Sequence, residues 1–363
     1  MPDCSLSLGF IFGKAQGVRH LMSSASNGKV KLTAEEGQML AEAAMKGAGY
    51  AQDEARILAE HAMDAALSGY EYSGLPKLLN VVDDPHFKDD RRPITIVKDN
   101  GAAVLVDGGW ENGMVAAYRA SEIAIERADT NGLSIVCLGN TWMTGRSALY
   151  CEMIARAGFV AMHTVSAPSW VAPFGGAARS LGTNPIAFGF PTSTDPLVID
   201  MGTSAFMGTD LQFRERIGAT LPEGVAIGPN GEPTINASEA KEGALLPFGG
   251  STGGYKGFGL ALAMDAIGAL AGGIRPENTQ TGYLFIAIKP DLFMPLEDYR
   301  REVSNRIKTI KATPRQPGIT EIRIPGERSM HERAKRLKEG IEIERKIYDA
   351  LQNLAAGNLN HGG

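Results

Sequence analysis

Cysteine is scarce in this chain of 363 residues, which contains three: Cys4, Cys137 and Cys151. The number is odd and no two of them are spaced as a C-x-x-C pair, so the sequence predicts neither a disulfide framework nor a structural zinc site. None of the six histidines belongs to an H-x-x-x-H pair, which disfavours metal catalysis. We therefore expect a cytoplasmic protein without a bound metal.

Long apolar runs and an excess of positive charge are also missing. No stretch approaches the roughly 18 apolar residues that a membrane helix needs. The apolar segment 4–13 lacks the basic leader and the cleavage site of an export signal. The formal net charge is −5 and the pI is about 5.8, whereas nucleic-acid-binding domains are usually basic. We expect neither a membrane segment nor a nucleic-acid partner.

The common nucleotide-binding motifs are absent as well. No G-x-G-x-x-G lies between a predicted strand and a predicted helix, as a Rossmann fold would require. Residues 249–259, GGSTGGYKGFG, are rich in glycine and open a predicted helix, an arrangement that favours anion binding. They do not form a P-loop, because neither Ser nor Thr follows the lysine. From the glycines alone, a phosphate site and a flexible loop both remain open.

The sequence does contain the pattern of a globular α/β protein, with 44% hydrophobic and 21% charged residues. Thr33 and Glu36 form a capping-box pattern that predicts the start of a helix. A second amphipathic helix reaches to about Ser68, and Gly69 predicts its end. We find no internal repeat, low-complexity tract or long linker, which suggests domains that are interleaved in sequence.

The rest of the chain alternates between the two periodicities. Strands are predicted at 93–99, 102–108, 133–140, 159–167, 184–191, 196–202, 282–290 and 320–326. Helices are predicted at 115–132, 147–158, 255–273 and near 295–311, and two charged helices extend through Leu354. Residues 205–253 are predicted to be rich in loops and turns. His163 ends a predicted buried strand, where a structural role is the simpler interpretation.

The stretch 171–204 places many turns at the ends of successive strands. It contains the sequences APFGG, LGTNP and VIDMGTS. Loops at strand ends are where α/β sheets usually place their ligands. Each turn by itself is consistent with a structural role, but their density predicts a site.

These motifs, together with GGYKGFGLALAMD and IPGE further along the chain, resemble the malate/L-lactate dehydrogenase-like oxidoreductases. This non-Rossmann family includes ureidoglycolate, sulfolactate and 2,3-diketogulonate dehydrogenases and piperideine-2-carboxylate reductase. The resemblance runs from about residue 32 to 355. It implies an α/β fold in which helical N- and C-terminal parts pack together beside a central, mostly antiparallel-sheet cofactor domain. It also implies a homodimer.

The resemblance further implies a division of the chain. A helical, substrate-binding and dimerisation domain would comprise 32–125 and 290–355, and an NAD(P)-binding domain would comprise 126–289. We expect 1–31 to be a disordered extension. NAD or NADP would be bound by Asn184, Val198, Ile199, Asp200, Met201, Gly202, Tyr255, Lys256, Gly326, Glu327 and Arg328.

The predicted substrate site departs from the family pattern. The family usually has Ser-His-Gly after its second helix, with an arginine three residues beyond the glycine. This chain has Tyr72-Ser73-Gly74 and then Lys77, so Ser73 stands in the place of the histidine that donates a proton. Thr141, in NTWM, replaces a second family histidine. Ser73, Lys77, Thr141 and Tyr72 are the candidate catalytic residues.

The replacements alter the expected chemistry. Serine and threonine hydroxyls are poor acids at neutral pH, and lysine lacks the two-pronged grip of arginine on a carboxylate. Tyr72 or Tyr70 could donate the proton if Lys77 lowered its pKa. Alternatively, a protonated imine substrate would need less help from an acid.

Three hypotheses follow. The first is an NAD(P)-dependent oxidoreductase that acts on a small 2-oxo or 2-hydroxy acid, other than simple malate or lactate, or on a cyclic imino acid. The second is a nucleotide-binding paralogue that has lost catalysis and acts as a sensor or partner subunit. The third, and weakest, is an enzyme whose substrate is not a carboxylate.

Overall fold

The computed structural model describes residues 28–271 and 281–361, and the described chain divides into two compact units. Unit 1 contains the residues up to Phe87 and those from Ser329 onward, and unit 2 contains Lys88–Arg328. The boundaries therefore differ from the predicted ones at 125 and 290. Strands of the central sheet begin before residue 125, and a helix after residue 290 also belongs to unit 2.

Unit 1 joins the two ends of the described chain through a short antiparallel sheet. Strand β1 (Lys29–Leu32) pairs with β11 (Ile341–Glu344). The predicted extension 1–31 is therefore wrong for residues 29–31, whereas its residues 1–27 lie outside the described residues. The two predicted C-terminal helices are present, and β11, whose alternating burial is typical of a strand, lies between them.

Helices form the rest of unit 1. They are α1 (Ala34–Gly47), α2 (Gln52–Leu67), α3 (Pro76–Asp83), α11 (Arg345–Ala355) and most of α10 (Glu327–Glu339), with a short 3₁₀ helix η2 (Glu71–Ser73). The capping box at Thr33 is confirmed, because its hydroxyl accepts from the Glu36 N–H at 3.1 Å and the Glu36 carboxylate accepts from the Thr33 N–H at 2.8 Å. Helices α1 and α11 pack closely at Gly47, where a side chain would overlap the Leu354 backbone.

Unit 2 is built around a seven-stranded sheet in the order β2-β3-β4-β10-β5-β6-β7. Only the β3–β4 pair is parallel, so the predicted mostly antiparallel sheet is confirmed. The strands are β2 (Thr95–Asn100), β3 (Ala103–Asp107), β4 (Leu133–Gly139), β5 (Val160–Ser166), β6 (Ile186–Phe190), β7 (Leu197–Met201) and β10 (Gly282–Ile288). Strand β10 enters the middle of the sheet from far along the chain.

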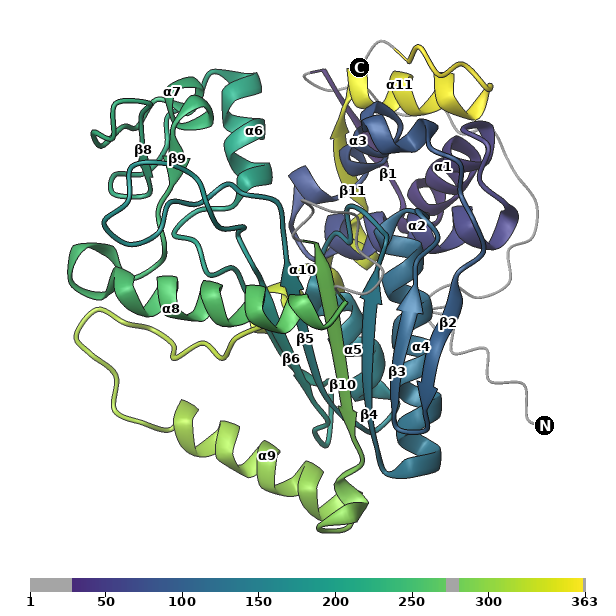
Figure 1. Cartoon of the computed structure of the whole chain (residues 1–363), viewed down its shortest axis with the longest axis vertical. Coiled ribbons are helices and arrows are strands. Elements are labelled where there is room, and N and C mark those ends of the chain that lie inside the picture. Colours follow the sequence, from purple (N-terminus) through teal and green to yellow (C-terminus); the bar gives the residue numbers. More distant parts are fainter. Residues whose placement is uncertain (1–27, 272–280, 362–363) are drawn as a thin grey trace. The chain divides into compact units, whose positions relative to one another are not determined.

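Helices cover both faces of this sheet. Helices α4 (Gly113–Asn131) and α5 (Ser147–Arg156) lie behind it, and α8 (Gly250–Gly268) passes in front of β5 and β10 (Figure 1). Helix α8 approaches the sheet closely, since a side chain at Gly268 would overlap Ser166 of β5. The small and apolar residues of α8 favour this close packing. Its first turn is rich in glycine, which has a low helix propensity, so the sequence predicted a later start, at residue 255.

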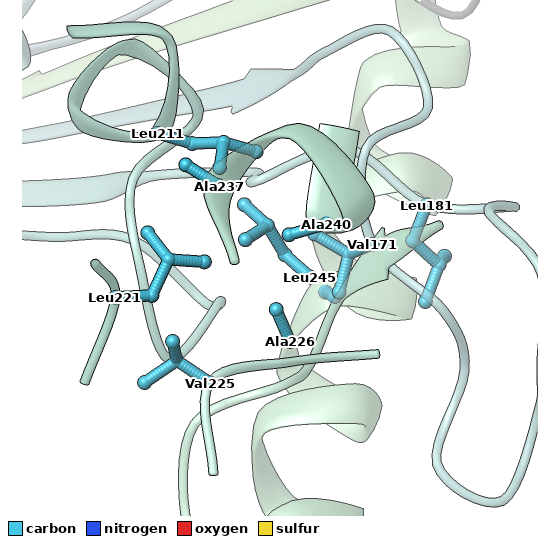
Figure 2. Packing of buried hydrophobic residues seen from close by; sticks show 10 residues of the cluster. Val171, Leu181, Leu211, Leu221, Val225, Ala226, Ala237, Ala240 and Leu245 are labelled. Carbon is cyan, nitrogen blue, oxygen red and sulfur yellow. The ribbon is translucent and has the colours of Figure 1, made fainter. Parts of the chain in front are cut away.

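The segment predicted to be rich in loops, 205–253, contains more regular structure than expected. It contains α6 (Gly208–Ile217), β8 (Ala226–Ile227), α7 (Ala237–Glu242) and β9 (Ala244–Leu245) before α8 begins. Residues of these elements, of the loops beside them and of α8 form a small hydrophobic core (Figure 2). Its members are Val171, Leu181, Leu211, Leu221, Val225, Ala226, Ala237, Ala240, Leu245 and Ala261. The elements are short, so their periodicity is weak in the sequence.

The last part of unit 2 contains a correct and an incorrect prediction. Helix α9 (Leu296–Lys311) is confirmed. The predicted strand 320–326 is wrong: its alternating pattern is that of a strand, but the segment has no pairing partner among the described residues and runs as extended chain into a turn. None of the helices in the described ranges is both long and apolar enough to cross a membrane.

Candidate active site

In unit 1, the candidate substrate residues lie on the turn that joins α2 to α3. Helix α2 ends at Leu67, and Gly69 adopts a left-handed φ of 83°, so its predicted role as the helix stop is confirmed. The chain then forms η2 and passes through Gly74, where a Cβ would lie 2.9 Å from the Cβ of Ala66. A larger residue would push the turn away from α2.

Helix α10 holds this turn through polar side chains. The Tyr70 hydroxyl lies 3.2 Å from the Ser329 hydroxyl, and Arg336 donates to the Glu71 carboxylate at 2.6 Å. One turn earlier along α10, the Arg333 guanidinium forms a buried ion pair with Asp64 of α2. The α2–α3 turn is therefore anchored to a helix far away in the sequence.

The three candidate residues of this turn differ in their surroundings. Ser73 and Tyr72 are half-buried, and the Tyr72 ring meets the Tyr70 ring edge-on at 6.4 Å between centroids. Lys77, in the first turn of α3, is only 8% exposed. Burial lowers the pKa of the Lys77 ammonium from 10.5 to about 8, and the nearby charge of Asp84 opposes part of that shift.

In unit 2, Thr141 belongs to a strained pair of loops at the end of β3 and β4. Its side chain is 2% exposed, and its hydroxyl donates to the Glu111 carbonyl at 2.6 Å. Trp110, Asn140 and Met143 all have positive φ, which is uncommon for residues with a side chain and is often found at functional sites. The Thr141 proton is thus bonded within the protein, where it cannot also be donated to a substrate.

The glycine-rich motifs of unit 2 meet at one junction. The backbone N–H and the hydroxyl of Thr203 both donate to the Thr183 carbonyl, at 2.9 and 3.0 Å. The Phe248 N–H donates in turn to the Thr203 carbonyl at 3.0 Å. A Cβ at Gly257 of α8 would lie 2.5 Å from the Phe248 carbonyl oxygen and 3.1 Å from that of Thr203. The GTNP, MGTS and YKG motifs therefore form one packed assembly, which we call the Thr203 junction.

Asn184 is the buried polar centre next to this junction. Its carbonyl oxygen accepts from the Ala167 N–H at 2.9 Å, and its amide donates to the Ala261 carbonyl at 3.0 Å and to the Asp265 carboxylate at 2.8 Å. The Ser166 hydroxyl donates to the same carboxylate at 2.8 Å. The side chain predicted to contact the cofactor is thus directed at α8 and β5.

The predicted cofactor strand is β7, at the edge of the sheet. Val198 is buried, Ile199 and Gly202 are half-buried, and Asp200 and Met201 are exposed. The Asp200 carboxylate accepts from the Ala148 N–H at 2.8 Å, in the first turn of α5, where the helix dipole favours a negative charge. This contact gives Asp200 a structural role in holding α5, whatever else it binds.

The PGER turn packs on the same strand. Gly326 has a φ of 86°, and a Cβ there would lie 2.7 Å from the Val198 carbonyl oxygen. Glu327 accepts from Lys311 at 2.6 Å and from the Ile324 N–H at 3.0 Å, whereas Arg328 is exposed. Two segments predicted to bind the cofactor are therefore neighbours, although more than a hundred residues separate them.

Helix α8 begins without a side-chain cap. Its N-cap residue is Gly249, with a left-handed φ of 108°. Tyr255 is 54% exposed, Lys256 is exposed, and Phe174 meets the Tyr255 ring edge-on at 6.4 Å. The first-turn N–H groups and the lysine together present positive charge to solvent.

Several residues of these assemblies were not predicted from the sequence. Asp265 had a visible signal, since it interrupts the apolar run of α8. Arg333 and Arg336 had none, because charged residues are common on an exposed helix. His163 is fully buried against Tyr150 and Phe285, and burial lowers its pKa to about 4, consistent with a structural role.

Comparison with known proteins agrees with this arrangement. The profile of the malate/L-lactate dehydrogenase family matches residues 32–352. Malate dehydrogenase of Pyrococcus abyssi is 34% identical over 329 residues, which cover 85% of this chain and 89% of that protein. This chain belongs to the malate/L-lactate dehydrogenase family, and the resemblance found in its motifs is confirmed. The protein is accordingly an oxidoreductase.

Solved structures show the same fold. Malate dehydrogenase from Pyrococcus horikoshii OT3 superposes with a TM-score of 0.81 at 29% identity, covering 93% of this chain and 98% of that one. The Δ1-piperideine-2-carboxylate reductase from Pseudomonas syringae pv. tomato superposes with a TM-score of 0.77 at 26% identity, covering 89% and 99%. The α/β fold expected from the sequence is therefore confirmed.

Proposed function

We propose that this protein is an NAD(P)-dependent oxidoreductase that transfers a hydride to or from a small 2-oxo or 2-hydroxy acid, or a cyclic imino acid. The observation that carries the proposal is the Thr203 junction, in which the family motifs of unit 2 support one another through backbone contacts. Malate and piperideine-2-carboxylate, the substrates named for two relatives, define the two substrate classes.

The residues of unit 2 fit a nicotinamide dinucleotide. The uncapped first turn of α8 offers backbone N–H donors to phosphate oxygens, and Lys256 adds a positive charge. A Cβ at Gly250 or at Gly253 would meet nothing within 4 Å, so the approach to this turn is open. Asn184, β7 and the PGER turn would shape the surrounding surface. When bound, the nicotinamide would accept or supply the hydride.

In unit 1, the turn residues would bind the substrate. Lys77 carries the positive charge that attracts a carboxylate, and the Ser73 hydroxyl can donate or accept a hydrogen bond. In unit 2, Thr141 offers a hydroxyl oxygen that accepts, because its proton is bonded to the Glu111 carbonyl. Among the described residues, no group of His, Cys, Asp and Glu is arranged to hold a metal ion.

A direct test measures binding and turnover separately. NADH and NADPH binding is followed by nucleotide fluorescence. A panel of 2-oxo acids and cyclic imino acids is then assayed, with the oxidation of NADH or NADPH as the readout. We expect binding of at least one nucleotide and turnover with at least one panel member. Replacing Lys256 by Met should weaken nucleotide binding, whereas Lys241→Met, in α7, is the matched control. Failure to bind either nucleotide would contradict the proposal.

A second candidate is a nucleotide-binding paralogue without catalysis. The observation that favours it is the internal hydrogen bond of Thr141, which leaves no acid at the place of one family histidine. Under this alternative, NADH or NADPH binds normally but no panel member is reduced. The third hypothesis, a substrate without a carboxylate, predicts turnover only with neutral carbonyl compounds.

We also propose a homodimer. Helix α8 exposes Leu262 by 53% and Leu270 lies 61% exposed just beyond it, an apolar surface that a second subunit could cover. Sedimentation velocity should give a dimer for the natural chain and a monomer for Leu262→Glu. A monomeric natural chain would rule the dimer out.

A further inference from the structure

The APFGG motif begins a closed surface loop of unit 2, residues 172–180. Two backbone hydrogen bonds between Val171 and Leu181, at 2.8 and 3.0 Å, close the loop at its base. The Arg179 side chain adds a third contact, because its Nε donates to the Gly243 carbonyl at 2.6 Å. The base of the loop is therefore held in one conformation.

The tip of this loop is a tight turn that presents a phenylalanine. The Gly176 N–H donates to the Pro173 carbonyl at 2.8 Å, and Gly175 has a left-handed φ of 83°, which favours glycine at this position. Phe174, inside the turn, is 46% exposed. Because the turn already fixes the backbone, Phe174 would lose little conformational freedom on binding a ligand.

Phe174 packs near the start of α8, beside a second exposed ring. A Cβ at Gly254 would lie 2.8 Å from Phe174 Cδ2, so a side chain there would displace the ring. The next residue, Tyr255, is 54% exposed, and its ring centre lies 6.4 Å from that of Phe174 at an angle of 75°. We call these two rings the aromatic corner. A flat ligand can stack on one of them and meet the other with its edge.

The two segments that build the aromatic corner carry positive charge and no negative charge. Residues 172–180 and 246–258 contain Arg179 and Lys256 but neither aspartate nor glutamate, in a chain with a net charge of −5. The Lys256 ammonium lies 5.9 Å from the centre of the Tyr255 ring. A ligand that suits this place is flat, aromatic and negatively charged.

We infer that the aromatic corner binds the adenine base of NAD(P), while Lys256 and the first turn of α8 bind its phosphates. This inference rests on the proposed function. Adenine has the flat π faces that stack on aromatic side chains, and the attached pyrophosphate supplies the negative charge. The first turn of α8 lies open beside the corner, since a Cβ at Gly253, next to Gly254, would meet nothing within 4 Å.

The rival occupant of the aromatic corner is a second copy of this chain. Tyr255 lies seven residues before Leu262, on the same side of α8, and the proposed dimer would cover Leu262. The two occupants make different demands on residue 174. Stacking on a base needs an aromatic ring, whereas a contact between subunits accepts another apolar side chain of similar size.

The binding test compares the two halves of the dinucleotide. ADP-ribose, or 2′-phospho-ADP-ribose if NADPH is the nucleotide bound, contains adenine, whereas reduced nicotinamide mononucleotide lacks it. Calorimetry measures the first and nucleotide fluorescence the second. The variants are Phe174→Leu and Phe174→Tyr. Phe293→Leu, which changes an 83% exposed ring outside the corner, is the matched control.

We expect Phe174→Leu to weaken binding of the adenine half by about fivefold or more. Phe174→Tyr and Phe293→Leu should match the natural chain, and no variant should change binding of the mononucleotide. Binding of the adenine half within twofold of the natural chain in Phe174→Leu would overturn the inference. An equal loss for both halves would also overturn it, because the ring would then only support α8. So would conversion of a natural dimer to a monomer in sedimentation velocity.

A measurement on the unsubstituted chain avoids any effect of Phe174→Leu on folding. The chain is labelled with 3-fluorotyrosine, and the Tyr255 signal among the nine tyrosines is assigned as the one missing from Tyr255→Phe. Saturating ADP-ribose should shift this ¹⁹F signal, through the ring current of the stacked base, more than saturating pyrophosphate does. A shift no larger than that caused by pyrophosphate would overturn the inference.

The outcomes separate the two proposals. If neither NADH nor NADPH binds, the proposed function and this inference both fail. If one of them binds but the adenine half does not, or binds Phe174→Leu equally well, only the inference fails. If binding of the adenine half needs the ring of Phe174 and shifts the Tyr255 signal, the inference stands, whichever substrate is reduced.

Discussion

The α2–α3 turn of unit 1 and the Thr203 junction of unit 2 are held by different kinds of contact. The turn depends on charged side chains of α10, among them Arg333 with Asp64 and Arg336 with Glu71. The junction depends on backbone carbonyls and on a neutral amide, Asn184. Salt screens the exposed pair of Arg336 with Glu71, whereas it screens the buried pair of Arg333 with Asp64 and the hydrogen bonds of Asn184 much less.

The difference also concerns which residues remain available to a ligand. In unit 2, the buried motif residues are held by internal hydrogen bonds, whereas Tyr255 and Lys256 are exposed. In unit 1, the motif residue with an ionisable side chain, Lys77, is buried, and the charge of Asp84 opposes part of the lowering of its pKa. The motifs of unit 2 are thus fixed by their internal hydrogen bonds, whereas the α2–α3 turn of unit 1 leads to one buried, ionisable side chain, Lys77.

The largest effect should come from breaking the buried charge pair of unit 1. Arg333→Met leaves Asp64, whose side chain is 3% exposed, without its cation, which should destabilise the protein by about 3–5 kcal/mol. Urea unfolding followed by circular dichroism measures this. Adding Asp64→Leu should recover most of the loss. As a control, Arg301→Met breaks an exposed pair and should cost under about 1 kcal/mol; equal losses would mean that burial is unimportant.

The second effect has the opposite sign. The lowered pKa of Lys77 means that the folded state holds this proton less tightly than the unfolded state does. The destabilisation is complete below about pH 8 and disappears as the pH rises toward 10.5. Lys77→Met should therefore raise stability at pH 7 by about 3 kcal/mol, with the gain vanishing near pH 10.5. A gain in stability that does not depend on pH would contradict the prediction that a charged, buried Lys77 destabilises the fold.

The third effect concerns the neutral junction. Asn184→Gly removes three hydrogen bonds but tolerates the positive φ of 34°, and should cost about 2 kcal/mol. Asn184→Ala, the matched variant, should cost roughly 1 kcal/mol more because alanine resists the left-handed region. Both losses should be unchanged between 0.1 and 1 M NaCl in urea unfolding, in contrast to those of unit 1. A strong dependence of either stability loss on salt would contradict the difference proposed between the two units.

The smallest effect lies at the rim of the turn. The Glu71 side chain is 62% exposed although it is paired with Arg336, so Glu71→Gln should cost only about 0.5 kcal/mol at low salt. The loss should disappear in 1 M NaCl, where exposed charges are screened. The same unfolding assay measures it, and a loss above about 2 kcal/mol would show that this pair is as important as the buried one.

Local signals in the sequence predicted much of the fold. The capping box at Thr33, the hairpin of β2 and β3, and the long periodic helices are each encoded within a few neighbouring residues. Elements that depend on distant partners were missed. Residues 341–344 form a strand because β1 lies beside them, whereas 320–326 pair with no strand among the described residues, although β7 is an edge strand of the sheet. The first turn of α8 contains glycines, whose low helix propensity hides the start of this helix in the sequence.

The candidate site, too, could be predicted only where local motifs define it. Family motifs identified Asn184, β7 and the PGER turn, but the contact between Gly326 and Val198 depends on the three-dimensional fold. The partners of the α2–α3 turn, Arg333 and Arg336, could not be predicted, since an arginine on a charged helix is normally solvated. Whether Lys77 is buried is likewise decided by elements that pack from elsewhere in the chain.

The pairing of β1 with β11 has a consequence for how the protein is made. Strand β1, which contains Leu32, cannot pair with β11 until Ile341 has been synthesised. At about 5–20 residues per second, synthesis of the intervening chain takes on the order of 15–60 s. The strands of the unit 2 sheet are all synthesised before β11 emerges, and the face of α1 that packs on α11 remains uncovered throughout that interval. The nascent chain is therefore expected to need a chaperone for its first helices and not for its last.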